Sequence, residues 1–297
     1  MRNSKTTATL IGLTAIGMWS LLGLMGAATG KMPPFLLNAL AFGLSGLAAI
    51  ITLAMRGQLA SLRQPVIVWI VGVGGLFGFH FFYFTSLKTA PPVEANLINY
   101  TWPLLIVLFS GLLPGEKLRA HHIIGTVLGL AGAALIVTKG RSLTIAPEHL
   151  LGYGAAILSA LIWSTYSVIS RRLADVPTAA VAGFCLATAI LSGLCHALLE
   201  PAIWPVDATQ WIAVVGLGAL PLGAAFFVWD YGVKRGDIQI LGAASYLSPL
   251  LSTLFLILAG YGQFEWAIGG AALLITAGAL IASKDLFLKP KVVTTAP

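Results

Sequence analysis

Charged residues are scarce in this chain of 297 residues: Asp, Glu, Lys and Arg make up 9% of it, whereas hydrophobic residues make up 58%. A soluble domain has about 25% charged residues, because its surface must be hydrated. The scarcity therefore excludes an ordinary soluble protein and predicts a chain that lies in a lipid bilayer. The net charge of +7 does not indicate nucleic-acid binding, because Lys and Arg fall almost only between apolar runs and form no continuous basic face.

Cysteines and catalytic patterns are scarce as well. Cys185 and Cys195 are ten residues apart on one predicted helix, so they would lie about 15 Å apart, beyond the limit of about 7 Å for a disulfide. The chain has no His-Glu-x-x-His or Gly-x-Ser-x-Gly pattern, and residues 26–31 are one residue short of a phosphate-binding loop. We expect no cofactor, no metal site and no catalytic residues.

Long apolar runs fill the chain. Ten of them are near the length of about 20 residues with which a helix crosses about 30 Å of hydrocarbon. They cover residues 6–29, 34–55, 65–87, 91–113, 121–138, 150–170, 178–199, 209–233, 238–261 and 264–282. The first run exceeds the apolar core of about 7–15 residues in a signal peptide, so we interpret it as a retained helix. The predicted fold class is an all-α polytopic membrane protein with ten transmembrane helices.

Lys and Arg are distributed unequally between the two sides of such a bundle. With the N-terminus in the cytoplasm, thirteen of them would lie on the cytoplasmic side, and four on the outer side: Lys31, Lys88, Lys139 and Arg141. Positive residues are enriched in cytoplasmic loops. Both termini are therefore predicted to be cytoplasmic.

One segment of the chain, residues 80–103, recurs 146 positions later, so that Lys88 matches Lys234 and Tyr100 matches Tyr246. A unit of five helices crosses the membrane an odd number of times, so its second copy must be inverted. The predicted domains are a first repeat (1–143), a second, inverted repeat (144–286) and a cytoplasmic tail (287–297). Inverted repeats are typical of transporters, whose halves exchange conformations around a central site; duplication that only enlarges a bundle is the alternative.

Several motifs together resemble a known family. They are Trp-Ser at Trp19 and Trp163, Tyr followed three residues later by Pro in the fourth and ninth runs, and Gly115-Glu116 before Gly125, Gly129 and Gly132. The chain resembles the EamA branch of the drug/metabolite transporter superfamily, and most of all its bacterial exporters of aromatic amino acids. This resemblance implies a basket of helices around a central cavity in the bacterial cell inner membrane, with export of substrate. The second half has Gly262-Gln263 at the place that corresponds to Gly115-Glu116 in the first half, and this difference weakens any essential role for the carboxylate of this motif.

Polar residues in the fourth and ninth runs repeat at helical spacing. The two faces carry Asn99, Tyr100 and Pro103 in the fourth run and Ser245, Tyr246 and Pro249 in the ninth. Polar side chains that faced lipid would lack partners, so both faces should turn inward, either to line a cavity or to join helices by hydrogen bonds. The two prolines are predicted to kink their helices and to serve as gating points.

Aromatic residues in the middle of the runs indicate the substrate. Most membrane Trp and Tyr residues lie at helix ends, whereas Trp19 and Trp163 do not. Rings around a cavity would stack on flat apolar side chains and contact an ammonium group; a packed aromatic core is the alternative. The residues predicted to bind substrate are Trp19, His80, Tyr83, Asn99, Tyr100, Trp163, Trp229, Ser245 and Tyr246, with Pro103 and Pro249 as gating kinks.

The sequence thus predicts a transporter that exports aromatic or other neutral amino acids and related metabolites by alternating access. His80 is the one deep candidate for taking up a driving ion, and Asp230 is spaced to pair with Lys234, so facilitated transport is expected. Alternatives are an exporter of other small metabolites or drugs, with or without proton coupling, a membrane-embedded enzyme, which the missing catalytic motifs disfavour, and a structural partner that transports nothing. The expected partners are a small-molecule substrate and the lipid bilayer, without nucleic acid, and a monomer suffices.

Overall fold

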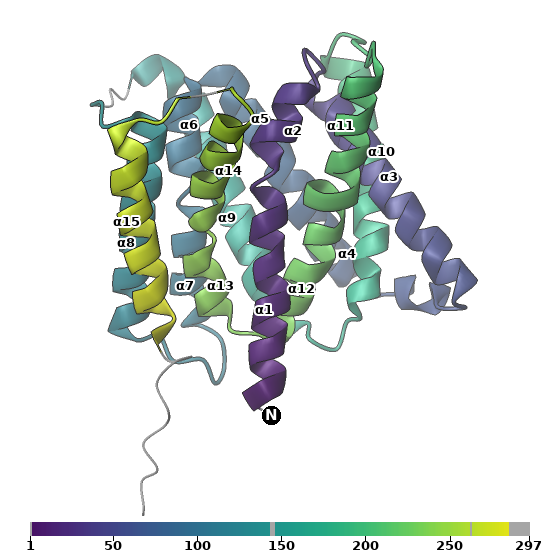
Figure 1. Ribbon diagram of the computed structural model, residues 1–297. Coiled ribbons are helices and arrows are strands. Elements are labelled where there is room, and N and C mark those ends of the chain that lie inside the picture. The colour runs from purple at the N-terminus through teal and green to yellow at the C-terminus, as the bar shows by residue number, and fades with distance from the viewer. Residues whose placement is uncertain (1, 143–145, 262, 285–297) are drawn as a thin grey trace, which may run out of the picture.

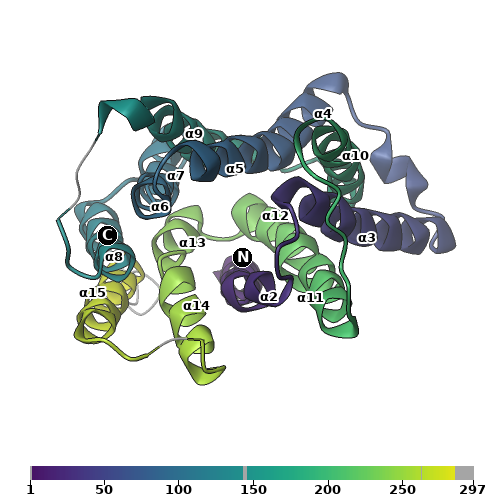
Figure 2. The same cartoon turned by 90° about the horizontal axis from the view of Figure 1, so that it is seen from above.

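The structure is a computed structural model that describes residues 2–142, 146–261 and 263–284, and every regular element in these ranges is a helix. The helices run side by side along one axis, and the N-terminus lies at the lower end of the bundle (Figure 1). Viewed along that axis, α2, α5, α12 and α14 surround the central region of the molecule (Figure 2).

Eight stretches of the described residues are long and apolar enough to cross a membrane. They are Ser4–Ala28, Pro34–Met55, Val66–Thr89, Ala120–Thr138, Pro147–Arg172, Thr178–Leu199, Ala208–Arg235 and Ile238–Leu258. The predicted class, an all-α polytopic membrane protein, is confirmed, and these stretches match eight of the ten predicted runs to within a few residues. The other two runs fold as the pair α6 (Pro92–Asn99) and α7 (Trp102–Ser110) and as α15 (Trp266–Ala282).

Several of these stretches consist of consecutive helices. The interrupted ones are α1 (Arg2–Trp19) with α2 (Leu22–Ala28), α4 (Val66–Val73) with α5 (Phe79–Thr89), α11 (Ala208–Ala219) with α12 (Ala225–Arg235), and α13 (Ile238–Ala244) with α14 (Leu247–Leu258). The continuous ones are α3 (Pro34–Met55), α8 (Ala120–Thr138), α9 (Leu150–Arg172) and α10 (Val181–Leu199). Three short 3₁₀ turns lie at Leu59–Leu62, Pro147–His149 and Thr178–Ala180.

Two kinds of interruption open the middle of the bundle. Pro103 and Pro249 have no backbone N–H, so each removes a hydrogen bond to the preceding turn, and the helix ends shortly before each proline. Two π-helical turns, Gly74–Gly78 and Leu220–Ala224, widen the backbone of the stretches that contain α5 and α12. Both kinds leave carbonyl groups without their usual helical partner, and in a membrane such groups are tolerated where they face the protein interior.

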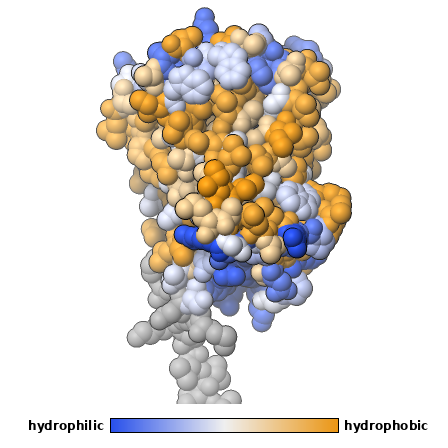
Figure 3. Space-filling model, turned by 90° about the vertical axis from the view of Figure 1, so that its right-hand side faces the viewer, coloured by the Kyte–Doolittle hydropathy of each residue, from blue (hydrophilic) through white to orange (hydrophobic). Residues whose placement is uncertain are grey.

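Small residues bring the outer helices together. A Cβ atom on Gly125 of α8 would lie 2.7 Å from the backbone nitrogen of Ala282 in α15, so the two backbones touch there. Such close packing of small residues is common between membrane helices. On the face that carries α3 and α10, a wide apolar belt lies above a polar lower rim (Figure 3). Its exposed side chains, among them Ile51, Ile190 and Leu194, have the composition of a surface that contacts lipid.

Candidate functional site

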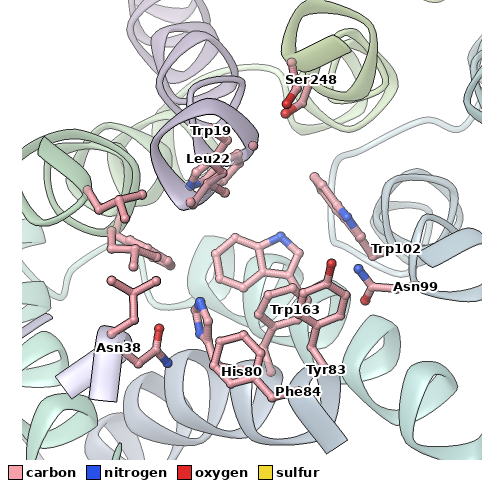
Figure 4. Close-up of a pocket in the computed structure, with 18 of the residues that line it drawn as sticks. Trp19, Leu22, Asn38, His80, Tyr83, Phe84, Asn99, Trp102, Trp163 and Ser248 are labelled. Carbon is pink, nitrogen blue, oxygen red and sulfur yellow. The ribbon is translucent and has the colours of Figure 1, made fainter. Parts of the chain in front are cut away.

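A cavity of about 390 Å³ lies inside the bundle. Its lining comes mainly from the central helices: Trp19, Leu22, Gly23, Gly26, Leu37, Asn38, Phe79, His80, Tyr83, Phe84, Asn99, Tyr100, Trp102, Trp163, Leu217, Leu222, Phe226, Ser248 and Ser252 (Figure 4). The lining runs from Trp19, the last residue of α1, along α2 to Gly26, and along α14 from Ser248 to Ser252. The cavity therefore extends from the middle of the bundle towards the upper end of Figure 1. Its size falls in the range of about 300–1,000 Å³ that is usual for small-molecule sites.

The wall of this cavity holds no Asp, Glu, Lys or Arg among the described residues. Aromatic and aliphatic side chains dominate it, with a few neutral amides and hydroxyl groups between them. A net charge placed here would lose its hydration without gaining an opposite charge. The cavity therefore suits a flat, largely apolar solute without net charge, such as a zwitterion.

Four tryptophans pack together at the base of the cavity, and we call this cluster the aromatic floor: Trp19, Trp102 and Trp163 line the cavity, and Trp229 is fully buried behind them. The ring centroids of Trp19 lie 5.0 Å from those of Trp229 and 5.7 Å from those of Trp163, and Trp163 stacks on Trp229 at 6.1 Å. The indole N–H of Trp19 donates to the carbonyl of Pro221, in the π-turn, at 3.1 Å. The π-turn thus supplies an acceptor that fixes one tryptophan of the floor.

The break between α6 and α7 places hydrogen-bond donors at the cavity. Asn99 ends α6, and its side-chain oxygen accepts a hydrogen bond from Ser159 at 2.8 Å, which leaves the amide nitrogen directed into the cavity (Figure 4). Trp102 begins α7, and neither its indole N–H nor that of Trp163 donates to another described residue. Three neutral N–H groups are therefore available to a carboxylate, which accepts such bonds strongly.

Below the aromatic floor, ionic contacts close the end of the bundle that contains the N-terminus, which we call the basic end. Arg171, at the end of α9, donates to the carbonyls of Val233 and Gly236 at 2.8 and 2.9 Å and pairs with Glu116. Because Glu116 lies before α8, whereas Val233 and Gly236 lie at the end of α12, one guanidinium group joins three segments that are distant in sequence.

A second contact at the basic end joins α1 to α13. The ammonium of Lys5 lies 2.9 Å from the carboxylate of Asp237, whose backbone N–H donates to the hydroxyl of Thr9 at 2.8 Å. Asp237 also caps α13, since its carboxylate accepts from the N–H groups of Gln239 and Ile240. Burial acts to raise the pKa of Asp237, but the hydrogen bond and charge of Lys5, together with the backbone hydrogen bond from Ile240 and the charge of His122, outweigh it. This pKa therefore lies below its usual value.

The opposite end of the bundle is joined at its periphery. The carboxylate of Glu200, after α10, accepts hydrogen bonds from the backbone N–H groups of Phe35 and Leu36 at 3.1 and 3.2 Å, and so caps the start of α3. It also lies 3.5 Å from Lys88 and 3.1 Å from His196. These contacts stabilise α3, α5 and α10 against one another beside the cavity.

Six of the residues predicted to bind substrate line this cavity: Trp19, His80, Tyr83, Asn99, Tyr100 and Trp163. The other three do not reach it. Trp229 is the buried member of the aromatic floor and donates to Ser167. Ser245 donates to the carbonyl of Leu241, and the hydroxyl of Tyr246 donates to the carbonyl of Tyr100. Pro103 and Pro249 are buried beside the helix breaks and do not line the cavity.

The lining also contains residues that are not among those predicted to bind substrate, including Asn38, Trp102, Phe84 and Ser248. Asn38 carried a usable signal, because it is a lone amide in the apolar helix α3 and is 1% exposed. Trp102 precedes Pro103, where a helix break was expected. No local pattern marks Phe84 or Ser248, which reach the cavity through the way α5 and α14 pack.

The apolar belt, the ionic contacts at the basic end and the solute-sized cavity define a polytopic helical membrane protein with a central cavity. The chain belongs to the EamA-like transporter family, whose sequence pattern matches residues 6–138 and again residues 150–284. It is 54% identical to the aromatic amino acid exporter YddG of Ancylobacter novellus, over 94% of this chain and 98% of that protein. The exporters of the same name from Salmonella typhimurium and Escherichia coli are 28% and 26% identical, over 92% and 94% of this chain and 96% and 97% of theirs. One crystal structure of a protein 53% identical in sequence superposes with a TM-score of 0.91, over 96% of this chain and 100% of that one.

Proposed function

We propose that this protein exports aromatic amino acids and related neutral metabolites from the cytoplasm across a bacterial inner membrane. The observation that carries the proposal is the cavity itself, which is walled by aromatic rings and free of Asp, Glu, Lys and Arg among the described residues. A zwitterionic amino acid with a flat side chain matches that wall in both shape and net charge. The names of the three exporters similar to this chain agree with this substrate class.

Within this proposal, the substrate ring stacks on Trp163 and its carboxylate accepts hydrogen bonds from Asn99, Trp102 and Trp163. Tyr83 stacks on Phe79 at 5.7 Å and donates to Asn96 at 2.6 Å, so it forms a fixed wall beside this position. The ammonium group would contact the π-faces of the neighbouring rings. None of the described residues in the lining is acidic, and this favours facilitated transport, because acidic residues within the membrane commonly take up a driving ion.

We also infer ten membrane-spanning segments in two inverted repeats, with α6 and α7 forming one segment and α15 another. The two π-turns, Gly74–Gly78 and Leu220–Ala224, lie 146 positions apart, as the repeat requires. The family pattern also matches the chain twice, with similar spacing. The direction of the two repeats supports inversion. Lys5, near the start of the first repeat, contacts Asp237 at the basic end. His149, near the start of the second repeat, lies at the other end of the bundle, where its Nδ1 is 3.3 Å from the carbonyl oxygen of Thr89.

The positive-inside rule supports a cytoplasmic basic end, since that end carries most of the Lys and Arg residues. The cavity would then face outward, because the aromatic floor and the contacts of Arg171 close it towards the cytoplasm. Pro103 and Pro249 would be the points at which their segments bend when the protein turns to the inward-facing state, which has to break those contacts.

The test is counterflow in proteoliposomes. Purified protein should exchange labelled phenylalanine, tyrosine and tryptophan but not a labelled sugar. Trp163→Ala should remove this exchange, whereas Trp211→Ala should not, because Trp211 lies on the outside of α11 and is 43% exposed. Exchange of the sugar alone would refute the proposal and favour a transporter of other metabolites. A requirement for a pH gradient would refute facilitated transport.

A further inference from the structure

Two polar side chains on one wall of the cavity have unused hydrogen-bonding groups. Asn38 is 1% exposed, and its buried amide nitrogen has no hydrogen-bond partner among the described residues. His80 is 6% exposed, and its Nδ1 lies 2.7 Å from the carbonyl of Leu76. A carbonyl oxygen can only accept, so Nδ1 carries the proton and the neutral ring presents the lone pair of Nε2. An unpaired amide in such a place destabilises the empty site.

The packing of α3 against α5 brings these two side chains to one place. The rings of Phe35 and Phe84 lie 5.5 Å apart, and those of Phe42 and His80 lie 5.1 Å apart. The two helices therefore run in opposite directions, and Asn38, one turn from both Phe35 and Phe42, faces the turn between His80 and Phe84. Figure 4 shows Asn38 and His80 on the same side of the cavity.

The opposite side of the cavity carries the donors that the proposed function assigns to the substrate carboxylate. In Figure 4, Trp163 lies between the Asn38 and His80 side and the side of Asn99 and Trp102. A substrate whose carboxylate binds at Asn99 and whose ring lies over Trp163 therefore directs the far edge of that ring towards Asn38 and His80. That edge carries the hydroxyl group in tyrosine and no polar group in phenylalanine, whereas in tryptophan it is the apolar benzo ring, because the indole N–H lies on the flank nearer the backbone.

We propose that Asn38 and His80 recognise the polar atom of the substrate side chain, an inference that rests on the proposed function. A phenol hydroxyl donates to Nε2 of His80 and accepts from the amide nitrogen of Asn38. A phenyl ring leaves both groups unpaired, and a buried site built to bind a hydroxyl group disfavours ligands that lack it.

The test compares affinities within each variant. Unlabelled phenylalanine, tyrosine and tryptophan compete with counterflow of labelled phenylalanine in proteoliposomes, for the wild type and for Asn38→Leu, His80→Phe and His80→Gln. In Asn38→Leu and His80→Phe the affinity for tyrosine should fall about tenfold relative to phenylalanine, the factor that one such hydrogen bond supports. His80→Gln retains an acceptor and should keep the preference for tyrosine.

The matched control is Ser248→Ala, which removes a polar group from another wall of the cavity and should leave the ratio unchanged. The ratio does not depend on the fraction of folded protein, so partial misfolding of a variant leaves the comparison valid. An equal loss of affinity for all three amino acids, or an unchanged ratio in both Asn38→Leu and His80→Phe, would overturn the inference. Absence of phenylalanine counterflow in the wild type would instead refute the proposed function.

Discussion

Replacement of Arg171 should destabilise the closure of the basic end. Its guanidinium donates to two carbonyls at the end of α12 and pairs with Glu116, and its side chain is 18% exposed. Hydrogen bonds to charged groups contribute about 1.5–3 kcal/mol each. When the basic end opens, water replaces some of these hydrogen bonds, so we expect Arg171 to stabilise the closed state by a net free energy of about 2 kcal/mol. Arg171→Met should therefore increase the population open at the basic end about 30-fold.

A buried reporter measures this population. Ser167 is fully buried beneath the aromatic floor, where it accepts a hydrogen bond from Trp229. In a background with Cys185→Ala and Cys195→Ala, a membrane-impermeant thiol reagent added at the basic end should react with the Ser167→Cys variant only when that end opens. While the open state is rare, the labelling rate is proportional to its population. Arg171→Met should therefore raise the labelling rate about 30-fold, in proportion to the open population.

The matched control is Arg172→Met, because Arg172 donates one hydrogen bond, to the carbonyl of Leu112, from an exposed position. Its effect should be several-fold smaller than that of Arg171→Met. An unchanged labelling rate in Arg171→Met would show that Arg171 does not hold the basic end closed. A rise that also occurs in Arg172→Met to the same extent would indicate general loosening and would equally refute the reasoning.

Three further predictions concern stability, each measured by unfolding in detergent. Gly125→Ala places a methyl group 2.7 Å from the backbone nitrogen of Ala282 and should lower the free energy of unfolding by about 1–3 kcal/mol. In the control, Gly17→Ala, the new methyl group meets nothing within 4 Å, so this variant should be as stable as the wild type or slightly more stable. Equal effects of the two substitutions would contradict the packing of α8 on α15. Glu200→Ala should lower the free energy of unfolding by about 1–3 kcal/mol, because two backbone N–H groups of α3 lose their acceptor. Glu200→Gln keeps an acceptor and should lower it less. Similar losses in the two variants would argue against the role of Glu200 as the cap of α3. The folded-state pKa of Asp237 is depressed, so its pairing with Lys5 contributes its full stabilisation above the unfolded pKa of about 3.9, and this stabilisation is lost as the pH falls through the folded-state pKa. Asp237→Asn should therefore lower the free energy of unfolding equally at pH 5 and pH 8. A loss of stability confined to pH 8 would contradict this.

Membrane-spanning segments could be predicted from the sequence because their signal is local. Residues 34–55 and 178–199 were predicted with the bounds that the structure has. The pair of Asp230 and Lys234 was also predictable, since residues four apart lie on one helix face, and their side chains are 2.9 Å apart. The breaks before Pro103 and Pro249 follow from the missing N–H of proline alone.

Other features have no local signal. The chain between α1 and α2 breaks at Ser20 without a proline, and the π-turn Gly74–Gly78 has no proline either. The second π-turn contains Pro221, but a proline alone does not distinguish a π-turn from an ordinary kink. These interruptions depend on contacts with neighbouring helices, such as the hydrogen bond from Trp19 to Pro221. Helical spacing showed which residues share a face, but it could not show which neighbouring helix covers that face.

The equivalent residues Tyr100 and Tyr246 illustrate which properties the sequence determines and which the tertiary structure determines. Sequence alone determined that these two tyrosines are equivalent, that both lie in apolar spans and that both turn towards the protein, because hydrophobicity and helical period act within one segment. Tertiary structure decided that Tyr100 lines the cavity while Tyr246 is fully buried with its ring against Gly129. The physical reason is that a cavity open towards one end of the bundle gives equivalent residues unequal surroundings, and that choice depends on contacts between distant helices.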